Sequence, residues 1–143
     1  MGLISVIVAA LAAFAAGAGY YMSLSKPWVE ASGVPTDDKG QPQNGSDPIL
    51  YLTSFVCIVL VAGMMRHTFA LSDIDTVGKG IVSGVGIGAF FISPWIFLNN
   101  AYSMRPRKLA VIDSGYAILA CAVIGLVLTL FGGGGAEPAA TAG

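Results

Sequence analysis

The polar side chains of this chain that are best suited to chemistry fall between residues 99 and 116, at a break between two long apolar runs. They comprise two amides, a guanidinium, a carboxylate and a phenol: Asn99, Asn100, Arg105, Asp113 and Tyr116. Polar groups inside an apolar segment are costly, so a carboxylate with a phenol about one helical turn further on suggests solute binding or proton transfer. All five also lie within about two helical turns of the end of an apolar run, where water is available. We therefore favour a structural hinge over a functional site here.

The remaining titratable and nucleophilic residues do not form a catalytic or metal-binding pattern. His67 has no second histidine and follows Arg66 at the end of an apolar run, where a basic pair caps helix carbonyls more often than it transfers protons. Cys57 and Cys121 lie in the middle of two different apolar runs at a similar depth, which permits a contact, but small packing residues are the favoured interpretation. We expect no enzyme, no metal and no cofactor.

The composition indicates a membrane protein. Hydrophobic residues make up 55% of the 143 residues and charged residues 10%, against roughly 25% charged residues in soluble domains. The mean hydropathy is +0.77. Four apolar segments approach or exceed the length of about 20 residues that a spanning helix needs, and they cover residues 3–22, 48–68, 77–101 and 109–131. Backbone groups in hydrocarbon must be satisfied within the segment, so we predict an all-α polytopic fold with four transmembrane helices.

These spans define the domain organisation and the orientation. One domain covers residues 1–131, with a polar loop at 34–48, and residues 132–143 form a flexible, low-complexity tail. With four spans, both termini lie on one side of the bilayer. The opposite side carries five of the seven basic residues, which are Lys26, Lys39, Arg105, Arg107 and Lys108. The positive-inside rule then predicts that this opposite side is cytoplasmic and that both termini lie on the non-cytoplasmic side of the membrane. The net charge of −1 gives no basis for nucleic-acid binding.

Small residues at a spacing of four occur in two of the predicted helices. The first contains Ala9, Ala13 and Gly17, and the third contains Gly80, Gly84 and Gly88. Such faces let membrane helices approach closely. We favour packing of the first and third spans within one chain over a homodimer seam. Gly86 adds a second small face to the third span, so that one face can pack inside the chain and another outside.

Two further features concern the shape of the third span and a possible duplication. Pro94 lies well inside this span and should kink it, because it removes one backbone donor. Residues 19–27 and 100–106 share an order of tyrosine, methionine and serine, a basic residue and proline. The likeness suggests two tandem two-helix repeats related by an axis along the membrane normal. Generic helix exits explain it equally well.

Two blocks of the chain resemble a known family. Residues 17–33, GAGYYMSLSKPWVEASG, are similar to its pattern of an aromatic-Tyr-Ser exit, a lysine, a tryptophan and a closing Ser-Gly. Residues 99–125 are similar to its Asn-Tyr, Arg-Pro-x-Lys and Asp/Asn-x-Gly-Tyr pattern. The family is DUF1761, small bacterial membrane proteins with four spans and no assigned activity. The resemblance implies the same four-span fold over most of residues 3–131 and leaves the function open.

Two classes of function remain after these exclusions. The first is a non-enzymatic scaffold or accessory subunit, embedded in the lipid bilayer, that forms a homo-oligomer or joins a larger membrane complex. The alternative is a small-solute transporter or channel that works as an oligomer, with the kinked third span and the polar cluster lining a path. A membrane-embedded enzyme would have only Asp113 with Tyr116 as an acid–base pair, and we favour it least.

Overall fold

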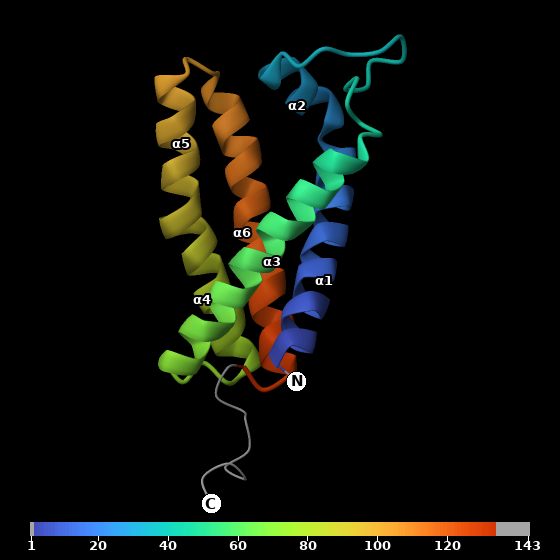
Figure 1. The fold of residues 1–143 in the computed structure, drawn as a ribbon. Helices are drawn as coiled ribbons and strands as arrows, with labels where there is room; N and C mark the ends of the chain where they lie inside the picture. The colour runs from blue at the N-terminus through green and yellow to red at the C-terminus, as the bar shows by residue number, and fades with distance from the viewer. Residues whose placement is uncertain (1, 134–143) are drawn as a thin grey trace, which may run out of the picture.

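The computed structural model describes residues 2–133 and shows an all-helical bundle (Figure 1). Its helices are α1 (Gly2–Ser23), α2 (Ser25–Ser32), α3 (Pro48–Leu71), α4 (Val77–Ile87), the π-helical turn η1 (Gly88–Ile92), α5 (Ser93–Tyr102) and α6 (Arg107–Leu130). The segments α4, η1 and α5 join into one span, Val77–Tyr102. Within residues 2–133, four helices are therefore long and apolar enough to cross a bilayer. The predicted fold class is confirmed. Residues 134–143 of the predicted tail lie outside the described residues.

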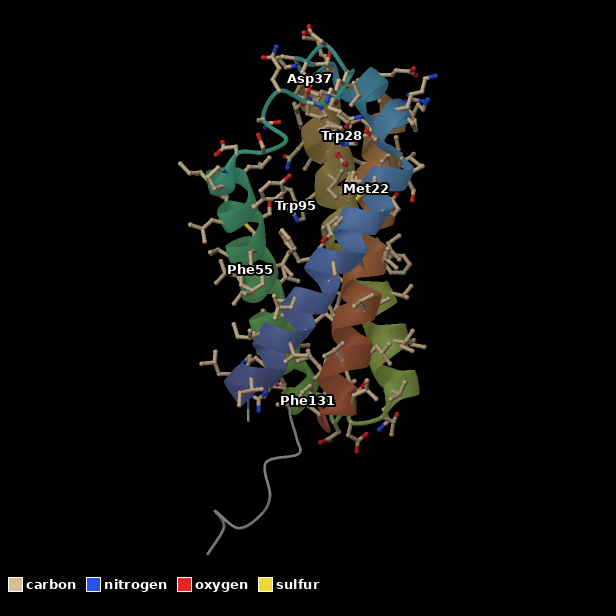
Figure 2. All side chains as sticks on the ribbon, turned by 90° about the vertical axis from the view of Figure 1, so that its right-hand side faces the viewer. Met22, Trp28, Asp37, Phe55, Trp95 and Phe131 are labelled. Atoms are coloured by element: carbon tan, nitrogen blue, oxygen red, sulfur yellow. The ribbon has the colours of Figure 1, made fainter. Side chains whose placement is uncertain are left out.

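The four spans place the connections at two opposite ends of the bundle. Gly2, the α3–α4 connection and the end of α6 lie at one end, whereas α2, the polar loop and the α5–α6 connection lie at the other (Figure 1). In Figure 2, Trp28 and Asp37 mark the end with the polar loop, and Phe131 marks the opposite end. All the candidate polar residues of the sequence therefore lie toward one end of the molecule.

Helix α6 is the centre of the bundle. It packs extensively on α1, on α4 and on α5, and only marginally on α3, which packs chiefly on α1. The buried share of the apolar window is 44% for α6 and 11% for α3. The largest fully buried side chains are Phe69 of α3 with Cys121, Ile124 and Leu128 of α6. A repeat of two helices would give α3 and α6 equivalent environments, whereas one is peripheral and the other central.

The glycine face of the third span packs against α6. A Cβ atom on Gly84 would lie 2.7 Å from the carbonyl carbon of Cys121, and one on Gly88 would lie 2.6 Å from Cα of Ile118. Gly80 approaches Gly125 and Thr129 in the same way. The small-residue faces of the first and third spans therefore both pack inside the chain, and α6 is the helix that both contact. Glycine spacing predicts a close approach but does not specify the partner helix.

Pro94 is accommodated by a π-helical turn. The N–H of Ser93 bonds to the carbonyl of Gly88, five residues earlier, and the Ser93 hydroxyl donates to the same carbonyl at 2.6 Å. A proline cannot donate to the carbonyl four residues before it, and a wider turn upstream is one way to adjust the backbone. The interruption expected in the third span thus takes the form of η1, and α5 continues from it without a break.

The α5–α6 connection is a tight turn with a strained centre. The N–H of Arg105 bonds to the carbonyl of Asn100, and Met104 between them has φ 55°. This is a Schellman ending, in which glycine is the usual residue at the left-handed position. Pro106 then precedes the first turn of α6, with φ −59° and ψ 141°. The turn fixes the start of α6, and with it the depth of the residues that follow.

Candidate functional site

Asp113 is the centre of a hydrogen-bonded group that joins three helices. It lies in α6, six residues after the helix begins, which places it about 9 Å along the axis. Its Oδ1 atom accepts a hydrogen bond from the Tyr21 hydroxyl of α1 at 2.7 Å and one from the Trp28 indole N–H of α2 at 3.1 Å. Both donors are uncharged. Within the described residues, the hydrogen bonds to this carboxylate therefore come from neutral side chains of α1 and α2.

Aromatic rings surround this carboxylate. Tyr21 makes edge-to-face contacts with Tyr20, Trp28 and Tyr116, at centroid distances between 5.2 and 6.0 Å. Such contacts add roughly 0.5–1.5 kcal/mol each beyond the buried area. The Tyr20 hydroxyl donates to the carbonyl of Ile112 at 2.6 Å, and that of Tyr116 donates to the carbonyl of Ala13 at 3.1 Å. The rings are thus anchored by backbone groups on the opposite helix, and their orientation is fixed.

Small residues let α1 approach α6 closely enough for these bonds. A Cβ atom on Gly17 would lie 2.7 Å from the Tyr116 hydroxyl oxygen. Gly115 stands beside the Tyr20 hydroxyl, where a Cβ atom would collide with it. Ala9 and Ala13, with Gly17, form the buried face of α1. The small-residue face predicted for the first span therefore lies in the contact between α1 and α6.

Helix α2 brings Trp28 to the same place. It starts almost directly after α1, with the Trp28 N–H bonded to the Leu24 carbonyl at 2.9 Å. It ends at Gly33, whose left-handed backbone (φ 68°) closes the helix through a bond from its N–H to Val29. The short helix packs on α6 as well as on α1. This geometry turns the indole back toward the carboxylate instead of toward solvent.

A cavity of about 330 Å³ opens beside this group, at the lower end of the roughly 300–1,000 Å³ typical of ligand sites. Its polar wall contains Asp113 with Tyr21 and Tyr116, and the rest is apolar. The apolar lining comes from α3, from η1 and α5, and from α6: Cys57, Ile58, Val61, Ile92, Ile96, Ala117, Ala120, Cys121 and Ile124. The cavity is thus a groove with α6 as its floor, and it has one polar end.

The sequence relationships agree with this architecture. The model of the family DUF1761, described as a protein of unknown function, matches residues 4–129. The chain belongs to the DUF1761 family. The matched region includes all four membrane-length helices almost completely and every residue of the Asp113 group. No curated protein and no solved structure matches the chain.

In this DUF1761 protein, the five polar residues singled out from the sequence do not form one cluster. Asp113 and Tyr116 line the groove together. Asn99 and Arg105 are exposed at the α5–α6 connection. The carbonyls of Asn99 and Asn100 accept the bonds that close α5, from Ser103 and Arg105. The Asn100 amide nitrogen is buried without a hydrogen-bonding partner among the described residues.

The partners of Asp113 are what sequence reasoning missed. Tyr21 and Trp28, which bond to Asp113, and Tyr20, which bonds to the carbonyl of Ile112, have the residue types of an interfacial aromatic belt. Nothing local indicates that they bond to α6, 85–92 positions away. A signal was nevertheless present, because a tryptophan indole and two tyrosine hydroxyls at this depth need acceptors. The two cysteines do line one cavity, where Cys57 is exposed and Cys121 is buried.

Proposed function

We propose that this DUF1761 protein is a non-enzymatic scaffold or accessory subunit of the bacterial cytoplasmic membrane. It packs against a second copy of itself or against a larger membrane complex. The observation that supports this proposal is the outer face of α4, which presents open glycines to the surroundings of the chain. The residues that the structure describes supply no partner for that face.

Helix α4 has two opposite glycine faces. Gly80 and Gly84 are buried against α6. A Cβ atom added to Gly78 or Gly86 would meet no atom of another described element within 4 Å, and Val82 between them is 73% exposed. The two faces are offset by two residues, or about 200° around the helix axis. Membrane helices associate through small residues that let backbones come close, so the open face is suited to a helix from outside the chain.

The test compares two glycines with equally open surroundings. Substituting Gly86→Leu fills the outer face of α4, whereas Gly19→Leu fills an open position on α1, away from that face. We expect native mass spectrometry from a mild detergent to show the wild type as a dimer or as part of a larger complex. Gly86→Leu should yield monomer and Gly19→Leu should not. A wild type that is strictly monomeric and free of partners contradicts the proposal.

The geometry gives less support to the transporter hypothesis. The cavity beside Asp113 is lined mainly by apolar side chains, whereas Asn99 and Arg105 are exposed at the end of the bundle. A path for a polar solute needs hydrogen-bonding groups along its length. The groove is better suited to an apolar body with one polar end.

A further inference from the structure

We propose that the groove beside α6 binds one phospholipid with a primary ammonium head group. The ammonium donates to the free oxygen of Asp113, and one acyl chain lies between α3 and α5. The site is independent of the outer face of α4, on which the proposed scaffold function depends. Three observations carry the inference: the oxygen of Asp113 that accepts no hydrogen bond, the length of the groove and the opening of the groove toward the bilayer.

The carboxylate has one oxygen that no described residue uses as an acceptor. Both hydrogen bonds to Asp113 fall on Oδ1, so Oδ2 accepts none from the residues that the structure describes. No lysine or arginine of the described chain lies within ion-pair distance of it. Asp113 nevertheless lines the cavity together with Tyr21 and Tyr116. A carboxylate in a membrane span is expensive without a cationic partner, and tyrosine and tryptophan rings attract such a cation further.

The groove has the length of one leaflet. Asp113 marks its polar end and Ile124 its deep end along α6. Eleven residues of helix separate them, which corresponds to about 16 Å at 1.5 Å per residue. The hydrocarbon core of a bilayer is about 30 Å thick, so one leaflet contributes about half of that. The apolar part of the groove is therefore long enough for the part of one acyl chain that lies in a single leaflet.

The groove is open on the side that faces lipid. Helix α3 crosses the bundle at an angle and diverges from α5 toward the end that carries α2 (Figure 1). Cys57 of α3 lines the cavity and is itself exposed, so the wall on the α3 side reaches the outer surface. A lipid enters sideways from the bilayer without passing through water. Membrane phospholipids are the amphiphiles available at that opening.

The charges around the opening suit the rest of the head group. Lys26, Arg107 and Lys108 are exposed at the same end of the bundle as Asp113. A phospholipid of this class carries a phosphate next to its ammonium, and these basic side chains attract that phosphate. A primary ammonium has three donors, whereas a quaternary ammonium has none. Only the primary form can donate to Oδ2 of Asp113.

The first experiment measures lipid binding to delipidated protein by native mass spectrometry. The lipids are dioleoyl-phosphatidylethanolamine, -phosphatidylcholine and -phosphatidylglycerol, added in turn to the full chain in a mild detergent. We expect one phosphatidylethanolamine to bind about tenfold more tightly than either of the others, because a charge-assisted hydrogen bond is worth at least that factor. Asp113→Asn keeps an oxygen for Tyr21 and Trp28 but removes the charge, so it should abolish the preference. Asp75→Asn, an exposed carboxylate at the opposite end, is the matched control and should retain it.

The second experiment tests the groove by chemical modification of the wild-type chain, with one conservative variant as a control. Cys57 is exposed and Cys121 is 1% exposed, so N-ethylmaleimide should alkylate Cys57 alone. Saturating phosphatidylethanolamine should slow this alkylation, and protein alkylated beforehand with N-phenylmaleimide should no longer bind the lipid. Cys57→Ser should bind the lipid and give no adduct.

Four outcomes would overturn the proposal. The first is equal affinity of the wild type for phosphatidylethanolamine and phosphatidylglycerol. The second is equal affinity of the wild type for phosphatidylcholine and phosphatidylethanolamine. The third is an Asp113→Asn variant that still prefers phosphatidylethanolamine as strongly as the wild type does. The fourth is alkylation of Cys57 at the same rate with and without lipid. None of these results depends on whether the chain forms a dimer.

Discussion

At the scale of single residues, Asp113 is a carboxylate inside a membrane span that receives its hydrogen bonds from neutral donors. Tyr21 and Trp28 share one oxygen and come from two different helices, α1 and α2. Hydrogen bonds to a charged acceptor are stronger than those between neutral groups. The same two bonds therefore stabilise the charge and attach the first two helices to α6.

Removing the phenol hydroxyl of Tyr21 should destabilise the fold. Tyr21→Phe deletes the bond to Asp113 but keeps the ring contacts, so we expect a loss of about 1–2 kcal/mol in the free energy of unfolding. Tyr102→Phe is the matched control, because Tyr102 is 83% exposed, and it should change stability by less than about 0.5 kcal/mol. Reversible unfolding in mixed micelles measures both. Equal stability of Tyr21→Phe and the wild type would show that the bond contributes nothing.

A second residue-scale prediction concerns the α3–α4 connection, outside the membrane spans. Lys79 donates to Asp75 at 3.0 Å, and this hydrogen bond together with the charge of Lys79 holds the pKa of Asp75 below its ordinary value. The pair therefore stabilises the folded state above the ordinary Asp pKa. That contribution is lost as the pH falls through the lowered pKa of the folded state.

The measurement is a carboxyl NMR titration of the protein in micelles. In Lys79→Gln the pKa of Asp75 should rise back toward its ordinary value, because both the charge and the strong donor are gone. The effect on stability should be small, since both side chains are more than half exposed. A pKa that stays equally low in Lys79→Gln would assign the shift to another group.

At the scale of helices, the two glycine faces of α4 have different structural roles. A Cβ atom on Gly84 would press on the backbone of Cys121, so Gly84→Ala should cost about 1–3 kcal/mol by forcing α4 and α6 apart. Gly86→Ala meets open space and should be neutral or slightly stabilising, since alanine favours helix more than glycine. Thermal unfolding in detergent compares the two variants directly. A Gly84→Ala variant that is as stable as Gly86→Ala would show that the close α4–α6 contact at Gly84 contributes nothing to stability.

The helices themselves could be predicted from the sequence, but their partners could not. Apolar length specifies a membrane span, because the bilayer thickness imposes it. It carries no information on neighbours, so the glycine spacing of the third span predicted a close approach within the chain but not that its partner would be α6. The same limit applies to the site. Asp113 and Tyr116 were identified because a polar residue in a span is costly, whereas Tyr21 and Trp28 become its partners only through tertiary packing.

At the scale of the whole molecule, the central position of α6 links the site to the fold. Helices α1, α4 and α5 each pack closely on it, and α3 is attached chiefly through α1. The divergence of α3 from α5 is what leaves the groove open. A chain whose helices all packed equally on one another would have no such opening, so the groove follows directly from the peripheral position of α3.

The orientation of the molecule in the membrane is the last prediction. The end that carries α2 and the polar loop has five of the seven basic residues, so the positive-inside rule places it in the cytoplasm and both termini outside. In a Cys57→Ser background, Ser72→Cys at the α3–α4 connection should react with a membrane-impermeant maleimide in intact cells. Asn44→Cys in the polar loop should react only after permeabilisation. Labelling of Asn44→Cys but not of Ser72→Cys in intact cells would establish the opposite orientation, with the groove in the outer leaflet.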